Sequence, residues 1–124
     1  MVNEHLLTFY DPPGCPLFEY IKNGIKTVEG RKNSPKNQQI MKDDIIVFIN
    51  EKTDEKLIAK VTYIHKYNDV LDYLKKETLS RALPCVKTYK DGIALYNEFS
   101  DPEERKSLRN KYGYGFLGIG IQVL

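Results

Sequence analysis

The chain has 124 residues, of which 41% are hydrophobic and 29% are charged, and its formal net charge is +2. This length suits a single domain spanning residues 1–124, with enough apolar residues for one compact core. No hydrophobic run is long enough to cross a membrane, and the first five residues lack the basic start and apolar core of a signal peptide. These features exclude a membrane protein and predict a cytoplasmic one.

The two cysteines, Cys15 and Cys85, are far apart in the sequence. Neither has a cysteine or histidine at the spacing of metal ligands. We therefore expect free thiols in a reducing compartment, no metal site and no cofactor. The oligomeric state is not indicated by the sequence, and a monomer is favoured.

Strand and helix signals follow one another through the first half of the chain. Asp11-Pro12-Pro13-Gly14 ends the first strand, and Asn23-Gly24 ends the first helix. The charged turn at 51–55 predicts that the strands on either side of it pair antiparallel. The expected elements are a strand at 5–10, a helix at 15–24, a strand at 26–29, a polar loop or single helical turn at 33–39 that adds nothing to the core, and strands at 45–49 and 56–67.

The second half is predicted to be mainly helical until its last strand. Asn68 or Asp69 is the expected N-cap of a helix at 69–76, and Ser100 or Asp101 the N-cap of a helix at 102–109. A second helical piece is expected at 77–83, the pattern at 92–99 fits helix or strand, and a last strand is expected at 115–123, where glycines at 115, 118 and 120 indicate bending or close packing. Taken together, these strands and helices predict an α+β domain with a small β-barrel and peripheral helices.

The stretch 22–32 holds the densest group of reactive side chains, bracketed by Gly24 and Gly30. Strand alternation places Lys26 and Val28 on one face and Thr27, Glu29 and Arg31 on the other. A bend after Gly30 can turn Arg31 back toward Lys26, so the grouping of these charges stays open.

The pattern Gly24-x-Lys26-Thr27-x-Glu29-x-Arg31 resembles the signature of ASCH domains, which belong to the PUA-like superfold. Later stretches resemble other landmarks of the family, in the same order. They are 40–48, Leu83-Pro84, 91–96 and 111–119, so that the resemblance covers roughly Pro16 to Val123. It implies a PUA-like β-barrel of mainly antiparallel strands with peripheral helices, and it favours helix at 92–99.

The resemblance also implies a role with RNA or a modified nucleoside. Some ASCH proteins look like RNA-binding modules, some are ribonucleases, and some are small amidohydrolases that remove the acetyl group from N4-acetylcytidine. The amidohydrolases use a lysine, a threonine and a glutamate. Their lysine falls on Lys26, but their threonine falls on Glu29, and their glutamate has only Glu77 or Asp91 as counterparts here. This departure favours binding over catalysis.

Residues 22–42 contain six basic side chains and one acidic one. This segment is either a basic stripe that attracts phosphate or a solvated lysine-rich loop. Glu29 can accept a hydrogen bond from the exocyclic amine of cytosine, act as an acid or base, or pair with its basic neighbours. The predicted ligand-binding residues are Lys22, Lys26, Thr27, Glu29, Arg31 and Lys32, with Lys36 extending the rim; Lys26 and Glu29 are the candidates for catalysis.

Aromatic and histidine side chains are the remaining candidates. Tyr96 and Tyr112 can stack on bases or serve as an acid in metal-independent RNA cleavage, whereas packing is favoured for Tyr114. His5 and His65 stand alone and are expected to be structural. The prediction is therefore an ASCH domain that binds RNA or a modified nucleoside in a basic cleft. The alternatives are an N4-acetylcytidine deacetylase-like hydrolase and a metal-independent ribonuclease.

Overall fold

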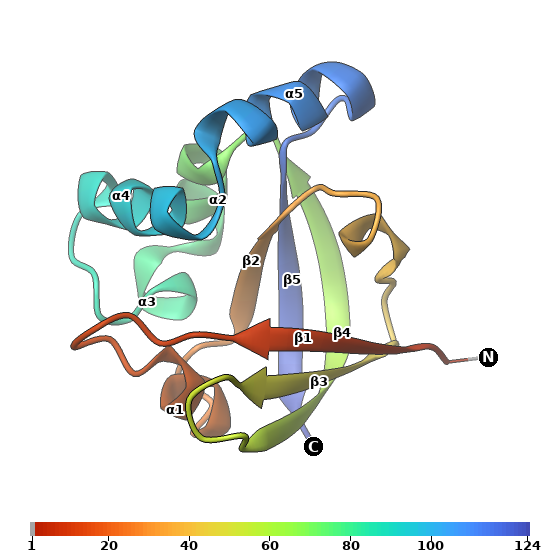
Figure 1. The fold of residues 1–124 in the computed structure, drawn as a ribbon, viewed down its shortest axis with the longest axis vertical. Helices are drawn as coiled ribbons and strands as arrows, with labels where there is room; N and C mark the ends of the chain where they lie inside the picture. Colours follow the sequence, from red (N-terminus) through yellow and green to blue (C-terminus); the bar gives the residue numbers. More distant parts are fainter. Residues whose placement is uncertain (1) are drawn as a thin grey trace.

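Five strands form one curled sheet in the computed structural model, which describes residues 2–124 (Figure 1). Their order across the sheet is β1-β3-β4-β5-β2. The strands are β1 (Glu4–Phe9), β2 (Val28–Lys32), β3 (Ile45–Asn50), β4 (Lys56–Tyr67) and β5 (Phe116–Val123). The sheet is an incomplete barrel, and together with the helices it confirms the predicted α+β class and agrees with a PUA-like fold.

Three of the four strand pairs are antiparallel. The predicted pair β3 and β4 aligns Val47 with Ile58, and β5 pairs antiparallel with both β4 and β2. β1 instead runs parallel to β3, with Leu6 opposite Val47. The register of β4 against β5 shifts between Val61 and Tyr63, which marks a bulge where the long strand bends.

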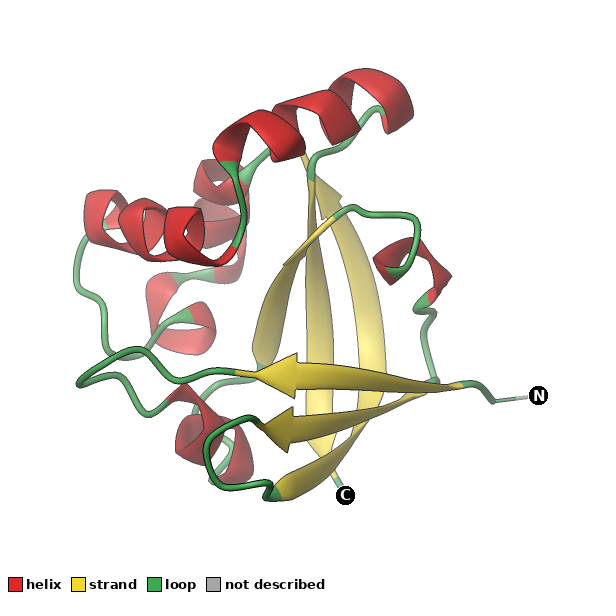
Figure 2. Cartoon of the chain, in the orientation of Figure 1, coloured by secondary structure: helices red, strands yellow, loops and turns green. Residues whose placement is uncertain are grey.

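Helices cover one side and one end of this sheet, as Figure 2 shows. The segment 92–99 lies within a helix, in agreement with the resemblance. Asp101 caps the last helix by accepting from the Glu103 amide at 3.0 Å, as predicted, whereas the Asp69 side chain accepts from Arg105 instead of capping. The helices are α1 (Leu17–Lys22), the 3-10 turn η1 (Asn37–Gln39), α2 (Val70–Glu77), α3 (Leu79–Ala82), α4 (Tyr89–Phe99) and α5 (Pro102–Tyr112). None of the helices within residues 2–124 is both long and apolar enough to cross a membrane.

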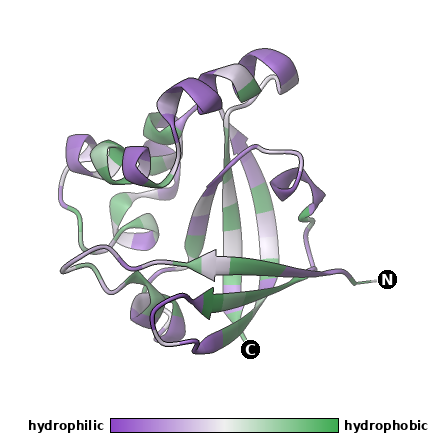
Figure 3. Cartoon of the chain, viewed as in Figure 1, coloured by the Kyte–Doolittle hydropathy of each residue, from purple (hydrophilic) through white to green (hydrophobic). Residues whose placement is uncertain are grey.

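The helix α5 is almost entirely hydrophilic and offers little apolar surface for packing (Figure 3). One buried arginine, Arg105, anchors it to the rest of the chain. The Arg105 guanidinium donates to Asp69 at 2.7 Å, to Ser100 at 2.7 and 2.9 Å, and to Asn97 at 2.6 Å. These partners satisfy the charged group on several sides, which a buried guanidinium requires.

The glycines of β5 are sites of close packing, as their spacing predicted. A Cβ atom at Gly120 would lie 2.3 Å from the Tyr63 ring, and one at Gly118 would lie 2.9 Å from the Tyr67 ring. No larger residue fits either position without a shift of these rings.

The loop at 33–39 contains the single helical turn η1 and adds no side chain to the hydrophobic core, as predicted, although Asn33 and Asn37 are buried. The Asn33 amide donates to the Tyr114 carbonyl at 2.8 Å, and the Asn37 amide donates to the Lys32 carbonyl at 2.9 Å. Side-chain amides can be buried there because these backbone groups pair with them. The loop is thereby fixed against the ends of β2 and α5.

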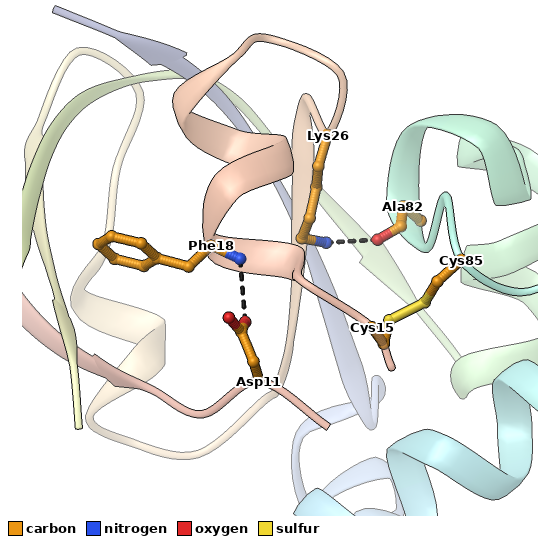
Figure 4. Close-up of a disulfide and its surroundings, with 6 residues drawn as sticks. All are labelled: Asp11, Cys15, Phe18, Lys26, Ala82 and Cys85. Atoms are coloured by element: carbon orange, nitrogen blue, oxygen red, sulfur yellow. Dashed lines mark hydrogen bonds between the residues drawn. A yellow bond between two sulfur atoms is a disulfide. The ribbon is translucent and has the colours of Figure 1, made fainter. Parts of the chain in front are cut away.

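The expectation of free thiols was wrong. Cys15 and Cys85 form a disulfide that joins the segment before α1 to the segment after α3 (Figure 4). The fold brings their Cα atoms to 5.5 Å, within the range that a disulfide spans, although 70 residues separate them in the sequence. The argument for a reducing compartment from unpaired cysteines therefore no longer holds.

Candidate functional site

The signature stretch enters the sheet two residues later than predicted. β2 begins at Val28 and continues to Lys32, so Lys26 and Thr27 precede it. Backbone hydrogen bonds fix this approach: the Thr27 amide donates to the Arg81 carbonyl at 3.1 Å, and the Thr27 carbonyl accepts from the Ile121 amide at 3.0 Å. The signature is thus held between α3 and β5 at Thr27, which lies between its charged residues Lys26 and Glu29.

Lys26 is buried, with 1% of its surface exposed. Its Nζ donates to the Val28 carbonyl at 2.7 Å and to the Ala82 carbonyl, the second of which Figure 4 shows. Nζ also lies 3.4 Å from Oε1 of Glu29. Burial lowers the pKa of Lys26, and the Glu29 carboxylate only partly opposes this shift.

Glu29 joins the two cations of the signature. Its Oε1 faces Lys26 and accepts from the Gly30 amide at 3.2 Å, while its Oε2 accepts from Nε of Arg31 at 3.0 Å. Arg31 in turn donates from Nη2 to the Thr8 carbonyl at 2.9 Å. The grouping that strand alternation left open is therefore one cluster, in which Glu29 pairs with both basic neighbours.

The packing around Gly30 explains why the signature strand has a glycine at this position. A Cβ atom there would lie 2.7 Å from the Phe116 ring and 2.8 Å from both the Tyr73 ring and the Tyr96 hydroxyl. Tyr96 is buried, and its hydroxyl donates to that of Tyr73 at 3.3 Å. Burial, together with the nearby Glu29 carboxylate, raises the pKa of Tyr96. The absence of a side chain at Gly30 thus lets these two rings pack under the signature strand.

A cleft of about 280 Å³ opens beside this cluster, and we name it the signature cleft. Glu29, Arg31 and Lys32 line it, whereas Lys26 lies behind Glu29, and Lys22 and Thr27 are not part of its wall. The other lining residues include Thr8, Phe9, Tyr10, Leu17, Asn37, Glu51, Tyr96, Phe99 and Ser100. Sequence reasoning missed the exposed aromatics Tyr10 and Phe99, because they follow a strand and end a helix without any motif around them.

The predicted basic rim is largely neutralised by ion pairs. Nζ of Lys22 lies 2.6 Å from Glu55, and Nζ of Lys32 lies 2.7 Å from Glu104. With Glu29 between Lys26 and Arg31, four of the six cations of the stripe have an acidic partner. Phosphate would have to compete with these carboxylates at the signature itself.

Glu77, one of the two residues considered for a catalytic glutamate, is buried and lies in a separate cluster whose other members are partly exposed. It accepts hydrogen bonds from the hydroxyls of Tyr63, at 2.6 Å, and Tyr67, and pairs with His65 at 2.9 Å and Arg81 at 3.3 Å. Burial alone would raise the pKa of Glu77, but the hydrogen bonds from the two tyrosines and His65 outweigh it and lower the pKa. This cluster ties β4 to α2.

The other candidate residues lie apart from the signature cleft. Asp91 is exposed in the first turn of α4. His5 pairs with the buried Asp44 at 2.8 Å, which supports a structural role. Packing with a half-buried ring was favoured for Tyr114, and its side chain is half-buried, with 42% exposed, where it precedes β5 at the rim of the sheet. No three His, Cys, Asp or Glu side chains gather as a metal-binding group in the described part of the chain.

Comparison with known proteins agrees with the resemblance carried by the signature. The model of the ASCH domain matches residues 15–119. No protein of curated function matches the sequence.

Solved structures share the fold over nearly the whole chain. The crystal structure of hypothetical protein PH0355 is 30% identical, with a TM-score of 0.80, and the match covers 98% of this chain and 99% of that one. The solution structure of PF0455 from Pyrococcus furiosus is 34% identical, with a TM-score of 0.71 and coverage of 100% and 98%. The structure of EF3133 from Enterococcus faecalis V583, at 12% identity, a TM-score of 0.61 and coverage of 100% and 81%, shares the fold alone.

Proposed function

The chain belongs to the ASCH domain family, and from this premise we propose that it binds RNA by seating one unpaired base, or a modified nucleoside, in the signature cleft. Membership of the family supports a general role in RNA binding. The volume of the cleft, about 280 Å³, is near the lower end of small-molecule sites. It suits a single base better than a folded RNA element.

The observation that carries this proposal is the fixed carboxylate of Glu29 in the wall of the cleft. Lys26 holds Oε1 from behind and Arg31 holds Oε2 from the side, at 3.4 and 2.9 Å. A carboxylate is acceptor-only when ionised and has room for about four donors. Four donor atoms already lie within 3.4 Å of this carboxylate: Nζ of Lys26, the Gly30 amide, and Nε and Nη2 of Arg31. A bound base would share one of the two oxygens with these donors, and the exocyclic amine of cytosine is a donor that uridine lacks.

Aromatic side chains supply the second part of base recognition. Tyr10 and Phe99 are 56% and 44% exposed, and both line the cleft. Unpaired bases commonly stack on exposed aromatic rings, and each such contact is worth about 1–3 kcal/mol. The cleft thus offers one polar acceptor and two apolar faces.

Calorimetric titration with free nucleosides tests this proposal. We expect cytidine to bind more tightly than uridine, because cytidine presents an exocyclic amine to Glu29 where uridine presents a carbonyl oxygen, and we expect Phe99→Ala to weaken both. Lys22→Ala is the matched control, since Lys22 is a surface cation of the same stretch outside the cleft. Equal affinity for cytidine and uridine, or no effect of Phe99→Ala, would overturn base recognition in the cleft.

Hydrolysis of an N4-acylated cytidine is a second candidate function, and the lowered pKa of Lys26 is the observation that favours it. A lysine that burial has made easier to deprotonate can share a proton with a neighbouring carboxylate. In this reaction Glu29, which lies between Lys26 and the cleft, would take a proton from water as the water oxygen bonds to the acyl carbon, and Lys26 would share that proton with it. The bond from the acyl carbon to N4 then breaks, and Glu29 returns the proton to the leaving amine.

Incubation with N4-acetylcytidine followed by chromatography separates the two functions. Turnover that is lost in Lys26→Met and kept in Lys22→Ala would establish the hydrolase. Recovery of the intact compound would leave binding as the function. Incubation of the wild type, Lys26→Met and Lys22→Ala with a single-stranded RNA in the presence of a metal chelator tests whether the protein cleaves RNA without a metal.

A further inference from the structure

Lysines that have no acidic partner gather away from the signature cleft. Lys66 near the end of β4 and the neighbours Lys75 and Lys76 on α2 are exposed and line one shallow hollow of about 750 Å³. No ion pair within 4.0 Å joins any of the three to a carboxylate of residues 2–124, in contrast to Lys22 and Lys32. These three charges are available to an external anion.

A second hollow of about 490 Å³ continues the first. Both are lined by Ile64, Lys66 and Tyr114. The second adds Lys42, a cation of the predicted stripe at 22–42 that has no acidic partner among the described residues 2–124. We name the two hollows together the basic groove. Its charged and aromatic lining includes Lys42, His65, Lys66, Lys75, Lys76 and Tyr114, together with Tyr67, Asp72 and Tyr112, and the amides of Asn33, Asn37 and Gln38 complete the polar wall.

Flat side chains accompany these charges. Tyr114 is 42% exposed and lines both hollows. His65, half of whose side chain is exposed, stacks on Tyr63 with 4.2 Å between ring centroids, and its bond to Glu77 fixes the ring. The one acid in the wall is Asp72, so the lining keeps an excess of positive charge.

We propose that the basic groove binds the phosphate backbone of a single-stranded RNA, with Tyr114 as a platform for one of its bases. This inference rests on the proposed function, because it extends the same RNA beyond the base in the signature cleft. Asn37 lines both the cleft and the second hollow, so the two sites are neighbours. Nucleotides next to the seated base can therefore reach the groove.

The combination of lysines with exposed rings favours a single strand over other anionic partners. Single-stranded nucleic acids bind grooves in which cations follow the backbone and aromatic rings stack on the bases. A duplex has its bases stacked internally and cannot use Tyr114 in this way. An anionic membrane would need only the charges, so the response of Tyr114 separates the two partners.

The test is fluorescence anisotropy of a labelled eight-nucleotide single-stranded RNA between 50 and 200 mM salt, with the whole chain. Each phosphate contact contributes about 0.7 to the slope of log K against log salt. The variant Lys66→Gln/Lys75→Gln/Lys76→Gln is expected to lower the slope by about 2 and the affinity at least tenfold. Tyr114→Ala is expected to weaken binding about fivefold or more, with the slope unchanged.

A control triple variant, Lys52→Gln/Lys90→Gln/Lys106→Gln, removes the same net charge from exposed lysines outside the groove. It should keep most of the wild-type slope. Equal slopes in the two triple variants would overturn the groove, and so would an unchanged affinity in Tyr114→Ala. Binding to phosphatidylserine vesicles that depends on the three groove lysines, with RNA binding unaffected, would overturn it in favour of a membrane.

The two proposals fail in different ways. If cytidine fails to bind but the triple variant of the groove lowers the slope of log K against log salt for RNA, the cleft proposal is wrong and the groove proposal is supported. If cytidine binds to both triple variants and their slopes of log K against log salt for RNA are equal, the groove proposal is wrong and the cleft proposal is supported.

Discussion

Lys26 and Glu29 meet behind the signature cleft, with 3.4 Å between Nζ and Oε1. The lysine is buried and its remaining donors are taken by two backbone carbonyls, so the pair has almost no freedom to rearrange. Arg31 holds the other oxygen of Glu29. The arrangement fixes the orientation of one carboxylate at the wall of the cleft, which is the feature that the proposed base recognition requires.

This pairing predicts strong energetic coupling between Lys26 and Glu29. We expect Lys26→Met and Glu29→Gln each to lower the free energy of unfolding by about 2–4 kcal/mol, since each leaves buried polar groups without a partner. The double variant should lose less than the sum, with a coupling energy of about 1–3 kcal/mol. Urea unfolding of the four proteins at pH 7 measures it. Additive losses would show that the two side chains act independently.

Gly30→Ala is predicted to destabilise the fold by at least about 2 kcal/mol. The added methyl group would meet the Phe116 and Tyr73 rings and the Tyr96 hydroxyl at less than 3.0 Å, and these rings are buried. Thermal unfolding measures the loss.

Gly113→Asn is the matched control for this substitution. Gly113 ends α5 with a φ of 90° and has open space around it, and asparagine tolerates this conformation. It should cost less than about 1 kcal/mol. Similar losses at the two glycines would contradict the steric explanation for Gly30.

The disulfide is predicted to contribute about 2–4 kcal/mol to stability. Cys15 and Cys85 close a loop across 70 residues, and a loop of this length restricts the unfolded chain by about 4 kcal/mol in the chain-entropy model. Cys15→Ser/Cys85→Ser should therefore unfold at a lower urea concentration than the oxidised protein. The wild type in excess dithiol should approach the double variant. Identical midpoints with and without dithiol would contradict the prediction.

Because the pKa of Glu77 is lowered, we expect the fold to lose stability in acid. Its pKa lies below the ordinary value of 4.5, since hydrogen bonds from Tyr63, Tyr67 and His65 outweigh the effect of burial. A carboxyl group with a lowered pKa in the folded chain stabilises the fold above its unfolded pKa, and this contribution is lost as the pH falls through the folded pKa. The free energy of unfolding should thus decrease below about pH 4.5.

Substitution isolates the contribution of Glu77. Glu77→Gln should be less stable at pH 7 and should show a shallower decrease between pH 5 and pH 3, as measured by urea unfolding at each pH. Glu98→Gln changes an exposed glutamate and should keep the wild-type slope. Parallel slopes for Glu77→Gln and the wild type would contradict this role.

The sequence allowed the fold to be predicted where local signals were strong. The turn before β4 is charged, Asp101 and Pro102 begin α5, and the signature lies next to helix-ending Asn23-Gly24, so each signal is contained in a few residues. The parallel pairing of β1 with β3 carries no such signal, because about 40 residues separate the partners. The disulfide was missed for the same reason.

The candidate site was predictable only in part. Lys26, Glu29 and Arg31 were found because they lie within one short motif. Pairing of Glu29 with its basic neighbours was one of three alternatives. The sequence could not choose among them, since the choice depends on where β2 begins and on the Ala82 carbonyl, 56 residues from Lys26. The basic groove was not predicted as a site. Lys42 and Tyr114 were noted separately, and α2 brings Lys75 beside Lys66 only after folding.

RNA binding at both sites can be measured together by an amide proton–nitrogen NMR titration with a short cytidine-containing single-stranded RNA. We expect shifts of the Gly30 and Arg31 amides, which lie at the signature cleft, and of the Lys66 and Tyr114 amides at the basic groove. Saturating RNA that leaves the Gly30 and Arg31 amides unchanged would contradict binding in the signature cleft.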